Sequence, residues 1–402
     1  MTATRTKRIL SVQPVCDGGG SEHALIRMLR QLASDGWECH VAVPGPARLA
    51  EEYAAAGIRL HIVGMSHLTT SGGAGRWLRF AFTWPVSVTQ VTRLAIRIGA
   101  GVLHTNSMHS WVGWASARLA RIPHVWHARE IVFQSDAALR VERFLARDFA
   151  DVVVAVSEAV ASQLDPANVV VITDEADPVE FRPSRAGAFR RSVGIGDSVP
   201  LVGSAARFDT WKGFDTLLDA FETVRARRPD AELVVAGAAV AGKEDYAEAL
   251  HRRAASLPGV HWVGHRRDIA ELMADLDVFV AVSSEPEPFG LVVVEALACG
   301  IPVVAGAAGG PLEILGSDAA AQPSAAGRLV EPGNAELTAE AILALLPETS
   351  GRDERAGRTP LRSPEQGRFV SLFNEVLETR HHERRRRITR SPKPRRPSDT
   401  PR

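Results

Sequence analysis

The sequence predicts two doubly wound α/β domains that face each other across a cleft. The chain has 402 residues, which is too long for one ordinary hydrophobic core and predicts two domains of roughly 150 to 200 residues. Short apolar strands alternate with helical stretches in each half, and this alternation is typical of parallel sheets. The composition, with 45% hydrophobic and 23% charged residues, is that of an ordinary soluble globular protein.

The first half opens with a strand, a helix and a second strand. Residues 9–12 are an apolar strand, residues 18–20 (GGG) a flexible corner, and Ser21 an N-cap. Apolar residues then recur at helical spacing until Gly36, and residues 41–43 form the next strand. Further strands of this half are expected at 102–104, 124–126 and 152–156. Such a βαβ unit requires a parallel sheet.

The second half restarts the alternation after a connector that contains proline and glycine, residues 177–200. Its strands are expected at 201–203, 232–236, 260–262, 278–280 and 302–304. The predicted division is an amino-terminal domain at 1–176, a carboxy-terminal domain at 177–362, a helix at 363–380 and a tail at 381–402. Ligands of such sheets bind at the carboxyl ends of the strands, so we expect the site in the cleft between the domains.

The formal net charge of zero hides an uneven distribution. Residues 381–402 contain nine Lys or Arg residues and two acids, so the other 380 residues carry 38 basic and 45 acidic side chains, a net charge of −7. This basic run has almost no apolar content and predicts a disordered tail. Contact with an anionic membrane and a solvated tail without a partner are the alternatives, and no specific nucleic-acid partner is expected.

Three cysteines, Cys16, Cys39 and Cys299, lack the spacing of metal ligands or of a CxxC pair. This spacing predicts no metal site. Because the amino-terminus runs directly into a strand, we expect no signal peptide, and a cytoplasmic location fits both observations. No window reaches the roughly 18 apolar residues of a membrane span. Segment 76–97 mixes aromatic residues with arginines, which fits either a peripheral helix on the inner face of the plasma membrane or a helix packed on the core.

Two turns suit a phosphate group. The corner at Gly19 and Gly20 would expose backbone N–H groups to an anion, although glycine is equally convenient there without a ligand, and the pattern is not the GxGxxG of dinucleotide-binding proteins. Arg207 and Lys212 lie in a loop after the strand at 201–203, before a helix that begins near Gly213. Two cations at a strand end indicate a clamp for a diphosphate, and two solvated surface cations are the alternative.

The stretch 285–295, EPEPFGLVVVE, places Glu287 and Glu295 eight residues apart around a Pro-Phe-Gly corner. The β-branched run 292–294 is compatible with a strand, but the next strand starts near Ile301 and EALACG is a good helix end, so we expect a short helix. Glycosidases hold two carboxyl groups about 5 Å or roughly 6.5 to 9.5 Å apart. A loop residue and a helix residue at this spacing favour about 10 Å, which indicates two contacts with one larger ligand.

Six segments of the chain together resemble one known family. They are GGGSEHALIRMLRQLASDGWECHVAVP, HTNSMHSWVGWASARLARIPHVWHARE, VVVAVSEAV, ARFDTWKGFDTLLDAF, VHWVGHRRDIAELMADLDVFVAVSSEPEPFGLVVVEALACGIPVVAG and GRLVEPGN. The E-x7-E element with its internal PFG is the most specific of them. From about Arg8 to Leu346 the chain resembles the retaining glycosyltransferases of the GT-B fold, family 4 (glycosyl transferases group 1).

The resemblance implies how the second domain holds a nucleotide sugar. Glu295 would bind the ribose hydroxyls and Glu287 would face the donor sugar. Arg207 and Lys212 would neutralise the diphosphate, which leaves without a metal ion in this family. The backbone N–H groups that would meet the sugar and the distal phosphate belong to Phe289, Gly290 and Leu291. The corner with Gly19 and Gly20 would close over the phosphates or the acceptor.

The first domain would supply the remaining contacts. His127 matches the family's active-site histidine, which contacts the donor sugar, while Arg129, Glu130, His109 and His104 are candidates for the acceptor side. The implied reaction retains the anomeric configuration by front-face transfer, since no protein nucleophile is evident. The donor would be a UDP- or GDP-sugar with no further cofactor, and the acceptor a hydroxyl group of a glycan, a glycolipid or a small molecule.

The connector departs from the family pattern. Where the family commonly has Asn-Gly, this chain has Asp174-Glu175, and glycine permits a turn that would strain Glu175. A nucleotide-sugar epimerase of the same fold and a catalytically impaired relative that binds sugar nucleotides are therefore alternatives to a transferase. The helix at 363–380 would cross back to the first domain, as the family's last helix does.

Overall fold

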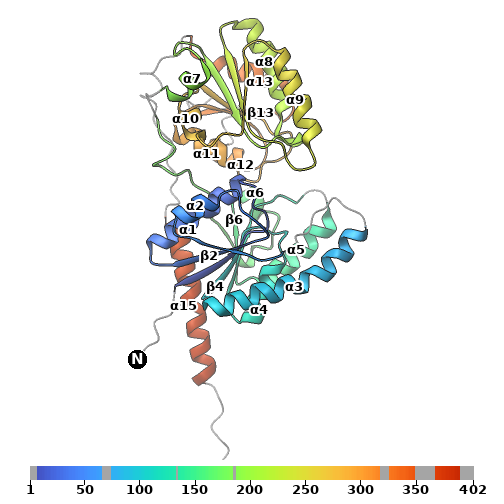
Figure 1. The fold of residues 1–402 in the computed structure, drawn as a ribbon, viewed down its shortest axis with the longest axis vertical. Coiled ribbons are helices and arrows are strands. Elements are labelled where there is room, and N and C mark those ends of the chain that lie inside the picture. Colours follow the sequence, from blue (N-terminus) through green and yellow to red (C-terminus); the bar gives the residue numbers. More distant parts are fainter. Residues whose placement is uncertain are drawn as a thin grey trace, which may run out of the picture.

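Two parallel sheets form the centres of two α/β domains (Figure 1). The structure, a computed structural model, describes residues 7–65, 74–132, 135–183, 187–316, 326–348 and 367–389. The strands of the first sheet are β1 (Arg8–Val12), β2 (Glu38–Val43), β3 (Arg59–Ile62), β4 (Val102–Thr105), β5 (His124–Ala128), β6 (Val152–Ala155) and β7 (Val169–Val171). Those of the second are β8 (Leu201–Ala205), β9 (Glu232–Ala236), β10 (Val260–Gly264), β11 (Val278–Ala281), β12 (Val303–Gly306) and β13 (Gly327–Val330).

Both sheets are doubly wound. The first has the order β3-β2-β1-β4-β5-β6-β7 and the second the order β10-β9-β8-β11-β12-β13. The order reverses between β1 and β4 in one sheet and between β8 and β11 in the other, and ligands of such sheets bind in the crevice beyond the carboxyl ends at these switch points. The predicted fold class is confirmed. The strands β3, β7 and β13 were not predicted; neither β3 nor β7 contains a buried residue, so the apolar pattern of a central strand is absent there.

Helices cover the sheets. In the first domain they are α1 (Gly20–Ser34), α2 (Ala50–Ala55), α3 (Ala74–Ile98), α4 (Val112–Ala120), α5 (Asp136–Phe149) and α6 (Glu158–Ala161). In the second they are α7 (Ala188–Val193), α8 (Phe214–Arg227), α9 (Glu244–Ser256), α10 (Ile269–Ala274), α11 (Leu291–Ala298), α12 (Gly310–Leu315) and α13 (Ala335–Leu345). The last helix is α15 (Arg368–Thr389), and two 3-10 turns lie at Pro166–Asn168 and Thr210–Lys212.

The start of α1 differs from the prediction. Its N-cap is Gly19 rather than Ser21, and no side chain caps the helix end. Two side chains instead accept hydrogen bonds from the backbone of the corner. Gly19 N–H donates to Asp17 Oδ1 at 3.1 Å, and Gly18 N–H donates to Glu22 Oε2 at 2.9 Å. These two carboxylates fix the backbone of the glycine corner without a serine cap.

The segment 76–97 belongs to the long helix α3. Its carboxy-terminal half buries Val88, Val91 and Leu94 in the core of the first domain, whereas Phe82 in the other half is 78% exposed. No helix within the described ranges combines the length and the apolarity that a membrane crossing requires. The packing alternative therefore holds for the second half of α3.

The last helix, α15, packs against the first domain. Phe369, Phe373, Val376 and Leu377 are buried in the cluster that surrounds α1 and the first sheet, and Figure 1 shows α15 beside α1. The helix continues to Thr389, so residues 381–389, expected as the start of the basic tail, are helical in the structure. Arginine is a good helix former, and this stretch contains no glycine or proline. Residues 390–402 of the predicted tail lie outside the described residues.

Candidate active site

Segments at the switch points of the two sheets are in contact between the domains. Phe289 and Leu291, which follow β11, pack with Met108 and Trp126 of the first domain in one apolar cluster. A methyl group added at Gly20 would lie 3.7 Å from Leu291 Cδ2. The site is therefore built from both domains.

The segment between the two glutamates is a loop followed by a helix. Helix α11 begins at Leu291, directly after Gly290, whose φ of +97° lies in the left-handed region that favours glycine. The β-branched run 292–294 is helical, as predicted. Packing decides this, because α11 buries Val293 and Leu297 against the second sheet, and burial overrides the preference of valine for strands, which depends on context.

Lys212 and Glu287 form an ion pair. Lys212 Nζ lies 2.7 Å from Glu287 Oε2, with only 14% and 18% of the two side chains exposed. Ser283 Oγ donates to the same carboxylate oxygen at 3.1 Å, and Lys212 also lies 3.9 Å above the Trp211 ring. We expected Lys212 to bind the diphosphate of the donor and Glu287 to face its sugar. In the structure the two side chains lie together beyond the carboxyl ends of β8 and β11.

Arg207 lies at the mouth of the site. It donates to Asp17 Oδ2 at 3.0 Å across the domain boundary, and half of its side chain is exposed. A methyl group added at Gly19 would lie 4.0 Å from Arg207 Cζ. The glycine corner and the predicted cation clamp thus face each other. Because the Arg207 ion pair is exposed, it adds little to stability and leaves Arg207 available to a phosphate.

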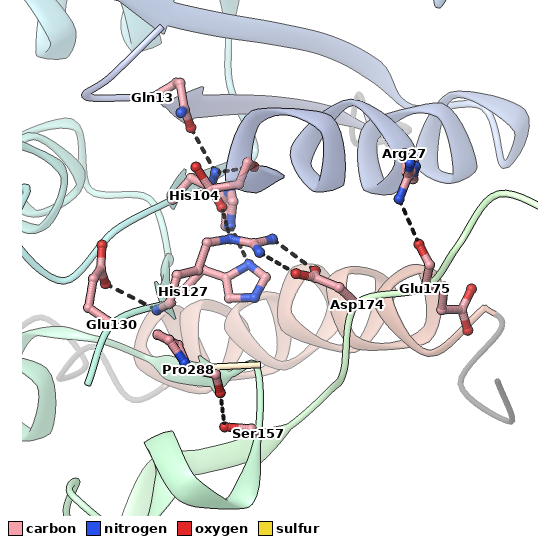
Figure 2. Close-up of polar contacts among 12 residues, drawn as sticks. Gln13, Arg27, His104, His127, Glu130, Ser157, Asp174, Glu175 and Pro288 are labelled. Carbon is pink, nitrogen blue, oxygen red and sulfur yellow. Dashed lines mark hydrogen bonds and ion pairs between the residues drawn. The ribbon is translucent and has the colours of Figure 1, made fainter. Parts of the chain in front are cut away.

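Glu295 is buried inside α11 and has a partner that was not predicted. Arg27 of α1 donates from Nη2 to Glu295 Oε1 at 2.6 Å and from Nη1 to Glu175 O at 3.1 Å, the contact drawn in Figure 2. Burial raises the pKa of the Glu295 carboxyl, while the charge and hydrogen bond of Arg27 lower it. No periodicity in the sequence points to a contact between residues 268 positions apart.

His127 does not lie on an open surface. It is the penultimate residue of β5 and is fully buried, and its Nδ1 is 3.3 Å from His104 Nε2 (Figure 2). The rings of Phe369 and Phe373 from α15 pack on His127 and His104, with centroids 5.6 and 5.9 Å apart. Burial, helped by the charge of Arg129, lowers the pKa of both histidines well below the usual value, so both are neutral. That His127 contacts the donor sugar stays a prediction.

Two of the acceptor-side candidates are engaged with the protein itself. Arg129 binds Asp174 with two bonds of 2.5 and 3.1 Å and donates from Nε to Asn106 Oδ1 at 2.6 Å. Glu130 accepts from the hydroxyl of Ser107 and from Met108 N–H. Both residues therefore shape the edge of the first sheet, and neither side chain is free for a ligand in this conformation.

The side chain of His109, a further acceptor-side candidate, is 33% exposed and pairs with Glu142 Oε1 at 2.7 Å. Burial lowers the pKa of His109, but the hydrogen bond to Glu142 and the charges of Glu130 and Glu142 outweigh this effect and raise the pKa to about 9. The imidazole is therefore a cation at neutral pH. Among the described residues, no group of three or more His, Cys, Asp or Glu side chains gathers as metal ligands.

The strain expected at Glu175 is not found. Among the described residues other than glycine, the positive φ angle belongs to Arg121. Asp174 and Glu175 instead serve as partners of the first domain, because the Asp174 carboxylate binds Arg129 and the Glu175 carbonyl accepts from Arg27. The connector therefore takes an ordinary backbone conformation and is held by two arginines.

A glycine pair that the sequence analysis missed supports the Pro-Phe-Gly corner. Gly309 and Gly310 precede and open α12, and Gly310 N–H donates to Glu287 O at 2.8 Å. A methyl group at Gly309 would lie 2.1 Å from Glu287 O, and one at Gly310 would lie 2.1 Å from Phe289 O. Only residues without a Cβ permit this approach, so the pair fixes the backbone around Glu287.

Replacing Gly310 by alanine is expected to weaken donor binding by about tenfold, because the Phe289 backbone must move and such overpacking costs about 1 to 3 kcal/mol. The affinity for a nucleotide sugar, measured by calorimetric titration, checks this. Gly45→Ala is the control, since no atom lies within 4 Å of its added methyl group. Equal affinities of the two variants would contradict the supporting role of Gly310.

Family models match both halves of the chain. The model described as Glycosyltransferase Family 4 matches residues 18–208, and the model described as Glycosyl transferases group 1 matches residues 187–359. The fold and the site thus define a GT-B protein. Together the two glycosyltransferase domain models cover residues 18–359, one in each half of the chain, and the two parallel-sheet domains have the GT-B architecture.

Curated relatives and solved structures agree with this class. The D-inositol 3-phosphate glycosyltransferase of Stackebrandtia nassauensis is 32% identical over 52% of this chain and 53% of its own. A GDP-mannose-dependent alpha-(1-6)-phosphatidylinositol monomannoside mannosyltransferase of Mycolicibacterium smegmatis is 32% identical over 55% and 56%. The matches thus span about half the length of these relatives. Anabaena HepE, solved in complex with UDP and glucose, has a TM-score of 0.73, 25% identity and coverage of 94% and 99%.

Proposed function

We propose that the protein transfers a sugar from a UDP- or GDP-sugar to an acceptor hydroxyl group, with retention at the anomeric carbon. The observation that carries this proposal is the grouping of Arg207, Lys212 and Glu287 at the carboxyl ends of β8 and β11, opposite the glycine corner of the first domain. Charges placed at a switch point suit a ligand that carries both a diphosphate and a sugar.

Lys212 and Arg207 stabilise the leaving group in this proposal. Negative charge develops on the distal phosphate as the glycosidic bond breaks, and cations held in place before the reaction stabilise such charge most effectively. Lys212 is held by Glu287 and by the Trp211 ring. The first N–H groups of α11 have no partner within the helix, so the backbone of Phe289, Gly290 and Leu291 offers further donors.

Glu287 and Glu295 bind two different parts of the donor. Glu287 lies beside Lys212 and faces the sugar, while Glu295 lies on α11 and binds the ribose. No protein nucleophile is required, because the departing phosphate oxygen accepts the proton of the incoming hydroxyl on the same face of the sugar. The phosphate charge is neutralised by side chains, so we propose a reaction that proceeds without a metal ion.

The named relatives support the choice of donor and reaction. HepE was solved with UDP-glucose as well as with UDP and glucose, and two of the mannosyltransferases are GDP-mannose-dependent. These names favour transfer over epimerisation. The acceptor lies, in this proposal, at the edge of the first sheet beside His109, where Arg129 and Glu130 fix the backbone.

A thermal-shift screen with UDP, GDP, ADP and their sugars tests the proposal. We expect one nucleotide series to stabilise the protein, since a ligand at about one hundred times its Kd adds about 2.7 kcal/mol to the free energy of unfolding. EDTA should leave the shift unchanged. NMR of the product of a transfer assay should then show the anomeric configuration of the donor. The absence of a shift with every nucleotide, or an inverted product, would contradict it.

A further inference from the structure

Arg27 reaches from the first domain into the second and contacts the buried carboxylate of Glu295. The two side chains are 13% and 8% exposed, and Nη2 lies 2.6 Å from Oε1. The guanidinium also donates to Glu175 O and lies 5.1 Å from the centroid of the Phe181 ring. Arg27 is thus fixed on three sides, by a carboxylate, a carbonyl and an aromatic face.

We propose that Arg27 is a positioning residue of the donor site, which keeps the Glu295 carboxylate ionised and oriented so that it accepts hydrogen bonds from the ribose. This inference rests on the proposed function. A carboxylate offers about four acceptor positions on its two oxygens. Arg27 takes one of them on Oε1, which leaves acceptor capacity for a ribose diol.

The electrostatics of the pocket explain why a cation is needed. Burial raises the pKa of Glu295, and the charges of Glu180 and Asp174 raise it further. The thiol of Cys299, one turn along α11, faces the same carboxylate, and burial together with the charge of Glu295 raises its pKa to about 12, so it stays neutral. Arg27 is the cation that opposes these effects on Glu295. Without Arg27 the carboxylate would take up a proton at a higher pH and would lose acceptor capacity.

The same face of α1 holds the connector. Arg27, Arg30 and Gln31 follow the spacing of neighbours on one helix face. Arg30 binds Asp177 Oδ2 at 2.8 Å, and Gln31 donates to Glu175 Oε2 at 3.3 Å. Because Arg27 joins this face to Glu295, the ribose site is complete only while α1, the connector and α11 are together.

The test is the affinity for the nucleoside diphosphate that the wild type prefers, measured by calorimetric titration between pH 5.5 and 8.5. We expect Arg27→Met to bind less well than the wild type at high pH, where only the orientation of Glu295 is lost, and roughly tenfold less well again near pH 6, since one pKa unit corresponds to a factor of ten. The sign follows from the raised pKa, because binding that needs the anion is lost as the pH falls through that pKa. The phosphate of the nucleoside diphosphate also titrates, with a pKa of about 6. Its effect on the affinity is the same for every variant, so comparison with the wild type at the same pH removes it.

Three further variants sharpen the result. Arg27→Lys should restore the wild-type pH profile, and Glu295→Gln should bind weakly with no pH dependence beyond that of the ligand. Arg147→Met, on α5 with a half-exposed side chain paired with Asp148, is the matched control and should behave as the wild type. If Arg27→Met does not fold, Arg27→Gln replaces it, with the same expectation.

Two outcomes would overturn the inference. If the affinities of the wild type and of the Arg27 variant depend on pH in the same way, Glu295 needs no cation and the inference is wrong. The proposed function would still stand in that case, because the wild type binds the nucleoside diphosphate. A wild type that binds no nucleotide would overturn the proposed function and the inference together.

Discussion

Replacing Lys212 by alanine is expected to lower kcat/KM for sugar transfer by about 10²- to 10³-fold, the usual cost of removing one preorganised group that stabilises developing charge. Lys212 Nζ lies 2.7 Å from Glu287 in a site where less than a fifth of either side chain is exposed. The variant loses the cation beside the leaving phosphate and also leaves Glu287 without its partner. Steady-state kinetics with the preferred donor measure the effect.

Lys7→Ala is the control for this measurement. Lys7 forms an exposed ion pair with Asp35 at the outer end of the first sheet, and such pairs contribute little. Its kcat/KM should equal that of the wild type, and both variants should keep the wild-type far-UV circular dichroism. A Lys212→Ala enzyme within threefold of the wild type would show that this lysine does not neutralise the leaving group.

Replacing Arg190 by methionine is expected to lower the free energy of unfolding by about 3 to 5 kcal/mol, because it leaves a buried charge unpaired. Arg190 and Asp277 are both 0% exposed and lie 2.9 Å apart. The guanidinium also donates to the carbonyl groups of Asp275, Gly196 and Val199. This network joins α7 to the amino-terminal ends of β8 and β11, the edge of the second sheet opposite the donor site.

Chemical denaturation of the wild type and of two arginine variants checks the effect. Arg147→Ala serves as the control, because its ion pair with Asp148 is exposed and surface pairs contribute little. We expect a clear fall in the denaturation midpoint for Arg190→Met and almost no change for Arg147→Ala. Similar midpoints for the two variants would mean that the buried pair does not hold the second domain together.

The fold could be predicted because its signal is local. Apolar strands and amphipathic helices alternate along the chain, and each element carries its own pattern, as β8 and α8 illustrate. The run 292–294 was assigned correctly because the next strand left no room for another one. Short strands such as β3, with half-exposed residues, carry too little pattern to be recognised.

The site was only partly predictable, because its geometry depends on contacts between distant segments. The sequence placed Lys212 and Glu287 in one region but could not show that they pair, nor that Arg27 approaches Glu295 from another domain. His127 was expected to contact the donor sugar, but the sequence could not show that its ring packs against Phe369, more than two hundred residues further along the chain. Nothing in the sequence around Gly309 and Gly310 indicates their role. They allow the backbone of Glu287 and Phe289 to approach closely, and this contact is visible only in the structure.

The most direct test of the central claim, that Arg207 and Lys212 clamp the diphosphate of a nucleotide sugar, is a comparison of two affinities. Calorimetric titration would give the Kd of the preferred nucleoside diphosphate and of its free nucleoside, for the wild type and for the double variant Arg207→Ala, Lys212→Ala. Two charge-assisted contacts predict a preference of the wild type for the diphosphate on the order of a hundredfold or more, and a preference near one in the double variant. An unchanged ratio in the double variant would contradict the account.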